Sequence, residues 1–211
     1  MSKVFLVFGP ESSGNNLTSL ILKTMSCYWE EPQLLDKFIV GEMSLAGITD
    51  NPNLVLRRSV PYGREWFDPT TASLEFERCG YKMYTIVLQR EWMATMLSNY
   101  YHRASDVGEA WNTLVSAEIH IAKFLHLLKP FYILNTSALM KDPEPCIKGL
   151  EIFTGLKWPK DVPYNSIIKD SDIGRHQLLL DHGFNSIDRM IHKKYITRPK
   201  AVVKRTSAKE R

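Results

Sequence analysis

The sequence predicts an α/β fold in which a mainly parallel sheet is flanked by helices on both faces. Short apolar runs, rich in β-branched and aromatic residues, alternate along the chain with segments whose apolar residues recur at helical spacing. The first of these runs is continuously apolar, as expected of a strand that is buried on both faces. The length of 211 residues is sufficient for one domain with a substantial core.

The first predicted unit is a strand, a glycine loop and a helix. Val4–Phe8 forms the strand, a tight turn with Gly9, Pro10 and Gly14 follows, and the helix carries its apolar residues at Leu17, Leu20, Ile21 and Met25. Such a loop directs backbone N–H groups toward one point, at the positive end of a helix dipole. We therefore expect a phosphate or another anion there, although an ordinary turn without a ligand stays open as an alternative.

The spacing from Gly9 to Gly14 is that of a P-loop. Asn15 replaces the lysine that reaches the outer phosphates, and Asn16 replaces the hydroxyl that holds magnesium. Kinase chemistry depends on both groups, so the loop predicts phosphate binding without a metal. The candidate phosphate-binding residues are Gly9, Pro10, Glu11, Ser12, Ser13, Gly14, Asn15 and Asn16.

A second strand is expected over Leu54–Leu56, and Arg57, Arg58 and Ser59 follow it directly. Ligands of open α/β sheets bind beyond the carboxyl ends of the strands. We therefore expect these three side chains to face the same crevice as the glycine loop. The alternative is a pair of solvated arginines.

The later elements continue the alternation of strands and helices. Arg90 lies at a strand end, and Ser98 lies two turns into the next helix. A mixed segment over Cys27–Gly47 has no assignment. The expected elements are helix Pro69–Arg78, strand Tyr81–Leu88, helix Trp92–Tyr101, helix Glu109–Leu128, strand Phe131–Leu134, helix Pro143–Phe153 and one or two helices within Asp172–Tyr195.

The charge is unevenly distributed. Lys193–Arg211 carries a net charge of +7, which leaves the preceding residues at −3 against a whole-chain charge of +4. We expect a single α/β domain over residues 1–195 and a basic, flexible tail over residues 196–211. Such a tail is usually solvated, and contact with nucleic acid or another polyanion is the alternative.

Cys27, Cys79 and Cys146 are far apart and form no C-x-x-C pair. This pattern favours a reducing compartment over a disulfide framework or a zinc site. No apolar run is long enough to span a membrane, and the chain enters a strand at once, without room for a secretory signal. We therefore expect a cytoplasmic protein.

Three segments together resemble the sulfotransferases that use 3′-phosphoadenosine-5′-phosphosulfate (PAPS). Ser12–Asn16 is similar to the P-G-S-G-N-T variant of that family's first loop. Arg90–Tyr101 matches an Arg at a strand end, a Ser eight residues on and a following Tyr-Tyr. Leu139–Pro143 and Phe153–Leu156 are similar to the family's D-L-x-x-D-P and F-x-G-L segments, with Ala138 in place of the first acid.

The resemblance implies a P-loop NTPase-like, sulfotransferase-like fold. It implies that the first loop binds the 5′-phosphosulfate end of PAPS, and that Arg90 and Ser98 hold the 3′-phosphate. No metal is required, which agrees with Asn16. Transfer of a sulfonate to a hydroxyl or amine needs an aligned acceptor, charge stabilisation and a base.

Two expected chemical positions differ from the family pattern. Ser12 replaces the loop lysine, so Arg57 or Arg58 becomes the candidate cation for the leaving phosphate. Ser59 replaces the histidine of K-T-H-x-P, and the candidate bases are then the carboxylates Glu42, Glu65 and Asp68. The candidate catalytic residues are thus Arg57, Arg58, Ser59 and Glu65.

Other readings stay open. Ser12 and Ser59 favour a non-catalytic protein that keeps the nucleotide or only the architecture, and a P-loop kinase is a third possibility. Trp66-Phe67 either lines an acceptor pocket or belongs to the core. His120 and His126 lie on different sides of one helix and are interpreted as structural or surface residues. The acceptor, a small molecule, glycan or peptide, is not identified by the sequence.

Overall fold

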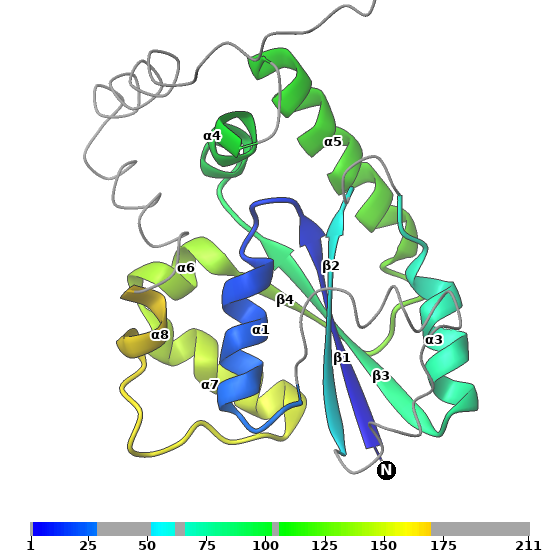
Figure 1. The fold of residues 1–211 in the computed structure, drawn as a ribbon, viewed down its shortest axis with the longest axis vertical. Helices are drawn as coiled ribbons and strands as arrows, with labels where there is room; N and C mark the ends of the chain where they lie inside the picture. The colour runs from blue at the N-terminus through cyan, green and yellow to red at the C-terminus, as the bar shows by residue number, and fades with distance from the viewer. Residues whose placement is uncertain (1, 29–51, 62–65, 103–105, 170–211) are drawn as a thin grey trace, which may run out of the picture. The chain divides into compact units, whose positions relative to one another are not determined.

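The computed structural model describes residues 2–28, 52–61, 66–102 and 106–169, all of which belong to the compact unit Met1–Gln177 (Figure 1). The described strands are β1 (Ser2–Pro10), β2 (Asn53–Val60), β3 (Tyr81–Gln89) and β4 (Phe131–Asn135). The described helices are α1 (Asn15–Thr24), α3 (Pro69–Arg78), α4 (Trp92–His102), α5 (Val107–Phe124), α6 (Thr136–Lys141), α7 (Pro143–Thr154) and α8 (Asn165–Lys169).

The four strands form one sheet in the order β2-β1-β3-β4, and all neighbouring pairs are parallel. This confirms the predicted fold class. β1 is an inner strand whose Val4 pairs with Leu54 on one side and with Met83 on the other. Its residues from Val4 to Pro10 are all buried, which explains why this run shows no polar alternation.

Helices cover both faces of the sheet. Val4, Leu6 and Phe8 point to one face and pack with apolar residues of α3 and α5. Phe5 and Val7 point to the other face and pack with residues of α1, α6, α7 and α8. Figure 1 shows the same division, with α1, α6, α7 and α8 on one side of the strands and α3 and α5 on the other.

Local signals for helix ends agree with the structure at two helices. Pro69 begins α3, and the Asp68 carboxylate caps it by accepting a bond from the Thr70 N–H at 2.8 Å. Gly155 ends α7 with a φ of 73°, a left-handed conformation that favours glycine. Asp142 lies at the N-cap position of α7, but its side chain makes no capping hydrogen bond.

Two predicted elements differ from the structure in ways that matter for the site, namely the second strand and the helix predicted over Glu109–Leu128. The predicted second strand ends at Leu56, whereas the ladder with β1 continues to the Pro10–Val60 pair. The polar residues after Leu56 are therefore part of β2. α5 begins two residues earlier than predicted because Asp106 caps it, accepting from the Glu109 N–H at 2.8 Å, and it ends at Phe124.

The structure adds α6, which the sequence did not predict. This short helix starts directly after β4, where the Asn135 side chain accepts a bond from the Ala138 N–H at 3.0 Å. Six residues are too few to show helical periodicity, so only the cap residue marked it.

Several predictions fall outside the described residues. They concern Glu42, Glu65, most of Cys27–Gly47, the helices within Asp172–Tyr195 and the domain boundary at residue 195.

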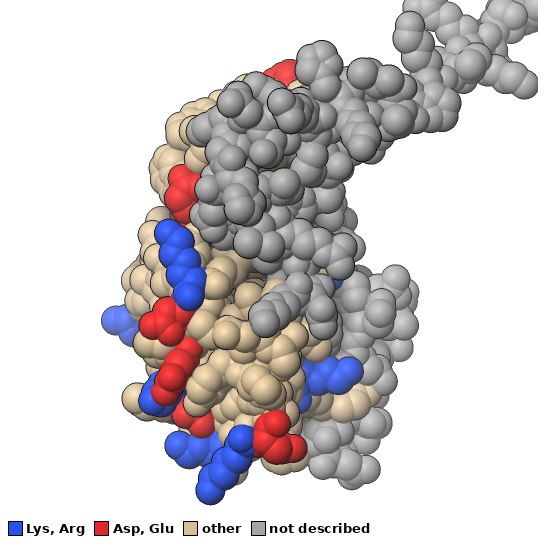
Figure 2. Space-filling model, turned by 90° about the vertical axis from the view of Figure 1, so that its left-hand side faces the viewer, with Lys and Arg blue, Asp and Glu red and all other residues tan. Residues whose placement is uncertain are grey.

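All three cysteines lie in the described ranges and are free. Among the described helices, none has the length and apolar character of a membrane span. Figure 2 shows acidic and basic side chains interspersed on one face of the molecule.

Candidate anion-binding site

The strand order creates a topological switch point at the carboxyl edge of the sheet. β2 lies on one side of β1 and β3 on the other, so the connections after β1 and β3 diverge there. Open α/β sheets bind ligands at this kind of switch point. Figure 1 shows the edge at the top of the strands, with α4 beyond it. The glycine loop follows β1 and Arg90 follows β3, so both lie at this switch point.

The glycine loop turns sharply through two left-handed residues. Ser12 has a φ of 66° and Gly14 a φ of 112°, and the Ser13 N–H donates to the Pro10 carbonyl at 3.2 Å. Gly14 occupies the N-cap position of α1 and has no side chain to cap the first-turn N–H groups. The loop therefore presents backbone donors at the positive end of the α1 dipole.

Gly9 is required by close approach. A Cβ atom at this position would lie 2.6 Å from Ser13 Oγ and 2.7 Å from Leu88 Cβ. Ser13 of the loop and Leu88 of β3 can thus approach the backbone of residue 9 because it has no side chain. This accounts for the first glycine of the loop by geometry.

The two asparagines of the loop have different environments. Asn15 is buried, and its Nδ2 donates to the Pro10 carbonyl at 3.0 Å and to Ser13 Oγ at 3.3 Å. The side chain that stands in the lysine position therefore braces the loop. Asn16 is exposed, Ser12 is partly exposed and Glu11 is buried.

Arg90 joins the loop to the end of β3. Its side chain is buried at 3% exposure, and its Nη1 donates to the Ser12 carbonyl at 2.8 Å. Its Nε and Nη2 atoms have no hydrogen-bond partner within the described ranges. Burial lowers the pKa of the guanidinium to about 10, so it remains charged at neutral pH. A buried cation with two unused donors is suited to an anion.

The helix after Arg90 buries polar side chains near the same edge. Glu91 caps α4, since its carboxylate accepts bonds from the Met93 and Ala94 N–H groups at 2.9 and 2.7 Å. Ser98 is 5% exposed and lies two turns into α4. Arg90 directly follows β3 and Ser98 lies in the next helix, and no hydrogen bond joins the two side chains among the described residues.

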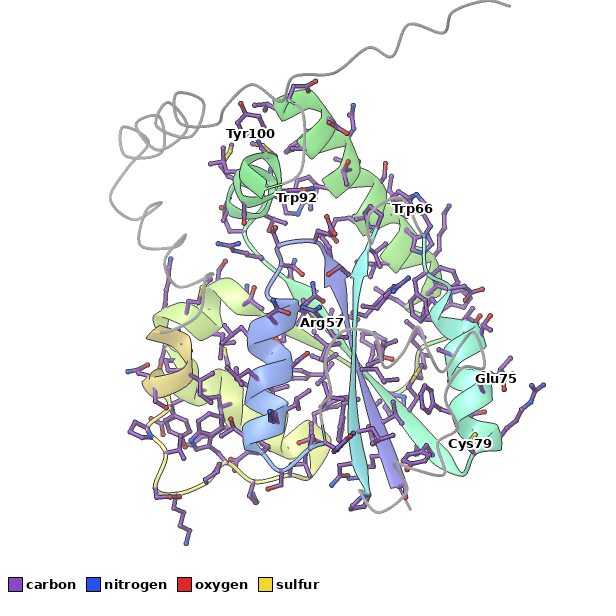
Figure 3. All side chains as sticks on the ribbon, in the orientation of Figure 1. Arg57, Trp66, Glu75, Cys79, Trp92 and Tyr100 are labelled. Atoms are coloured by element: carbon purple, nitrogen blue, oxygen red, sulfur yellow. The ribbon has the colours of Figure 1, made fainter. Side chains whose placement is uncertain are left out.

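The three polar residues of β2 do not share one direction. Arg57 pairs with Val7 and Arg58 with Phe8 in the β1–β2 register, and successive strand residues point to opposite faces. Arg57 and Ser59 therefore lie on the α1 face, and Figure 3 shows Arg57 beside α1. Arg58 lies on the other face, with its guanidinium 5.5 Å from the Phe67 ring centroid.

This placement corrects the expectation that Arg57, Arg58 and Ser59 all face one crevice. The error came from ending the strand at Leu56, because residues inside a strand alternate and residues beyond it need not. Arg57 is the arginine on the glycine-loop side of the sheet. Arg58 is buried at 7% exposure and makes a cation–π contact.

Among the candidate bases, only Asp68 lies in the described residues. Its Oδ1 accepts bonds from the Thr70 N–H and from the Thr70 hydroxyl, at 2.8 and 2.6 Å, so it serves as the cap of α3. Glu42 and Glu65 lie outside the described residues. Glu65 therefore remains a prediction.

The aromatic pair after β2 has a divided role. Phe67 is a core residue that packs edge-on against Phe8, whereas Trp66 is 46% exposed (Figure 3). His120 Nε2 lies 2.8 Å from the Phe67 carbonyl oxygen, and its ring is 5.2 Å from that of Trp66. His120 thus fixes this segment to α5, in agreement with the structural interpretation of this residue.

Sequence reasoning missed two hydroxyl residues that follow β4. Thr136 is fully buried, and its Oγ1 donates to the Ser13 carbonyl at 2.7 Å. The Ser137 hydroxyl accepts a bond from the Glu91 N–H at 3.0 Å. The available signal was the run Asn135-Thr136-Ser137 directly after a predicted strand, at the edge where sites form.

Comparisons with known proteins are consistent with this architecture. No family model matches the sequence, and no curated protein matches it. The sulfotransferase domain from the curacin biosynthetic pathway is similar with a TM-score of 0.53 and 15% identity, over 93% of this chain and 91% of that chain. The sulfotransferase domain from the Synechococcus PCC 7002 olefin synthase is similar with a TM-score of 0.52 and 14% identity, over 94% and 88%.

At these identities the likeness shows the fold. The sheet and its flanking helices define an α/β protein whose glycine loop is a candidate anion site. Within that class, the solved structures named above are sulfotransferase domains, and this chain has a sulfotransferase-like fold.

Proposed function

We propose that the chain is a sulfotransferase that moves a sulfonate group from PAPS to a hydroxyl or amine of a small-molecule acceptor. One observation carries the proposal. Arg90 is a buried cation with two unpartnered donor atoms among the described residues, and it touches the glycine loop through the Ser12 carbonyl. A second anion site beside a phosphate loop suits a nucleotide that carries phosphates on both its 3′ and 5′ oxygens.

The residues fall into two binding roles. The backbone N–H groups of the loop around Gly14 would hold the 5′-phosphosulfate end. Arg90 and Ser98 would hold the 3′-phosphate, for which a guanidinium provides paired donors in one plane. When bound, PAPS supplies the sulfonate group, and these residues supply its position.

The transfer breaks the bond between sulfur and the 5′-phosphate oxygen and forms a bond from sulfur to the acceptor oxygen or nitrogen. Arg57, on the α1 face of β2, is the proposed cation for the leaving phosphate, in place of the lysine that Ser12 replaces. Glu65 is the proposed base that takes the acceptor proton, and Ser59 is proposed to orient the acceptor. Arg58, on the opposite face, is assigned a structural role.

A second candidate function is a binding protein without catalysis. Ser12 and Ser59 favour it, because they stand at the two positions where the resembled family has a lysine and a histidine. This protein would keep the affinity for the nucleotide and lack the transfer step. A kinase is disfavoured by Asn15 and Asn16, which cannot replace the lysine and the magnesium-binding hydroxyl.

The test is transfer of radiolabelled sulfonate from PAPS to a panel of alcohols, phenols and amines in the presence of EDTA. A labelled organic sulfate or sulfamate that disappears in Arg57→Met supports the proposal. Tight binding of PAPS without labelled product from any acceptor class supports the binding protein. The matched control is Arg78→Met, because Arg78 is exposed on α3 and pairs with Glu75.

A further inference from the structure

Thr136 connects three strand ends through one hydroxyl group. It is the first residue of α6, directly after β4, and its side chain is fully buried. Its Oγ1 lies 2.7 Å from the Ser13 carbonyl oxygen and 3.2 Å from the Gln89 carbonyl oxygen. The first contact crosses 123 residues of sequence and reaches the glycine loop after β1.

Two consecutive carbonyl groups of the loop are therefore held from outside it. Arg90 Nη1 holds the Ser12 carbonyl at 2.8 Å, and Thr136 holds the Ser13 carbonyl at 2.7 Å. A trans peptide unit is planar, so its N–H points away from its C=O. Holding the Ser13 carbonyl toward Thr136 thus fixes the Gly14 N–H in the opposite direction.

The loop needs this support because its backbone is strained. Ser12 has a φ of 66°, which is unfavourable for a residue with a side chain, and such conformations persist only where surrounding contacts maintain them. A loop released from the Ser13 contact can relax, and the first-turn donors of α1 then lose their common orientation. Donors fixed in advance bind more tightly than donors that must be ordered on binding.

We propose that Thr136 is a positioning residue for the anion site, which holds the glycine loop in its phosphate-binding shape without itself binding the nucleotide. This inference rests on the proposed function, because it concerns the same site. Ser137 and Glu91 support the arrangement, since the bond between them ties α6 to the start of α4.

The experiment compares the affinity for adenosine 3′,5′-bisphosphate in four proteins by calorimetry: the wild type, Thr136→Val, Thr136→Ser and Thr154→Val. Valine keeps the shape of threonine and removes the hydroxyl, and we expect roughly tenfold weaker binding. Serine keeps the hydroxyl and restores the affinity to within about threefold of the wild type. Thr154 is the matched control, because it is equally buried and donates to the Leu150 carbonyl at 2.7 Å inside α7.

The outcomes separate the two proposals. Wild-type binding together with unchanged affinity in Thr136→Val, or an equal loss in Thr136→Val and Thr154→Val, overturns the role of Thr136 and leaves the proposed function standing. Absence of binding by the wild type overturns both. If the valine variant does not fold, Thr136→Cys replaces it, because a thiol is a weak donor, and wild-type affinity in that variant also overturns the inference.

Discussion

Replacing Arg90 by methionine should leave the ligand-free protein at least as stable while it removes binding. The guanidinium is 3% exposed, and burial lowers its pKa from 12.5 to about 10. A shift of this size corresponds to a penalty of roughly 3 kcal/mol on the charged form at neutral pH. Loss of the Nη1 bond to the Ser12 carbonyl costs about 1.5–3 kcal/mol, because its donor is charged. The free energy of unfolding should therefore not fall and should rise by at most about 1.5 kcal/mol, which raises the Tm by at most roughly 6 °C.

The effect on binding has the opposite sign. Two donor atoms of Arg90 have no partner among the described residues, and hydrogen bonds to charged groups contribute about 1.5–3 kcal/mol each. The affinity for adenosine 3′,5′-bisphosphate should fall by at least about 100-fold. AMP lacks the 3′-phosphate and should lose only the contribution of the Ser12 contact, about tenfold or less.

Thermal unfolding without ligand and calorimetric titration with both nucleotides measure these quantities. Arg78→Met on the surface of α3 is the control, and it should change neither the Tm nor the affinity for either nucleotide. If the variant loses equal affinity for the bisphosphate and for AMP, Arg90 does not bind the 3′-phosphate. A clear drop in the Tm of the ligand-free variant would refute the reasoning that this buried charge lacks compensation.

Three further predictions concern packing, thiol reactivity and magnesium. A Cβ atom at Gly149 would lie 2.3 Å from the Tyr132 hydroxyl oxygen and 3.2 Å from its Cζ. Gly149→Ala should therefore destabilise by about 1–2 kcal/mol, after the gain of about 1 kcal/mol in helix propensity inside α7. Tyr132→Phe should restore part of this loss in the double variant, and denaturant unfolding that shows no rescue would contradict the prediction. Burial raises the pKa of the Cys27 thiol to about 12, so at pH 8 iodoacetamide should label the exposed Cys79 and leave Cys27 unmodified. Mass spectrometry measures both, and equal labelling of Cys27 and Cys79 would refute the burial of Cys27. EDTA should not weaken the binding of adenosine 3′,5′-bisphosphate, because Asn16 offers no hydroxyl group to magnesium. A loss of affinity when EDTA removes magnesium would favour the kinase interpretation.

The parts of the fold with strong local signals could be predicted from the sequence. The apolar run of β1, the glycine loop and the helical spacing of α1 are contiguous and need no tertiary information. Pro69 and Gly155 mark the ends of α3 and α7 because their backbone preferences restrict where a helix begins and ends.

The extent of β2 could not be predicted, because its second half is polar. Arg57, Arg58 and Ser59 have no apolar pattern, and the hydrogen-bond ladder of β1 incorporates them into the sheet. The end of β2 also determines which residues belong to the candidate site, because the strand register decides which arginine lies on the same side of the sheet as the glycine loop. A misassignment of the four residues 57–60 thus became an error about which side chains lie on the same face of the sheet.

The candidate site was predicted where it depends on strand ends and was missed where it depends on long-range bonds. The loop and Arg90 are placed at the same edge by the order of the elements alone. The contacts from Arg90 to Ser12 and from Thr136 to Ser13 join segments 78 and 123 residues apart. Such contacts follow from the sheet order, which the sequence pattern does not specify.

The central claim is that the carboxyl edge of the sheet binds a nucleotide through two anion sites. A thermal-shift titration with adenosine 3′,5′-bisphosphate in EDTA, beside AMP and beside ATP with and without magnesium, tests it most directly. A ligand that binds only the native state raises the Tm, and the shift grows with the logarithm of the ligand concentration divided by its Kd. We expect the largest shift from the bisphosphate, independent of magnesium. A shift from magnesium-ATP alone, or from none of these ligands, would contradict the claim.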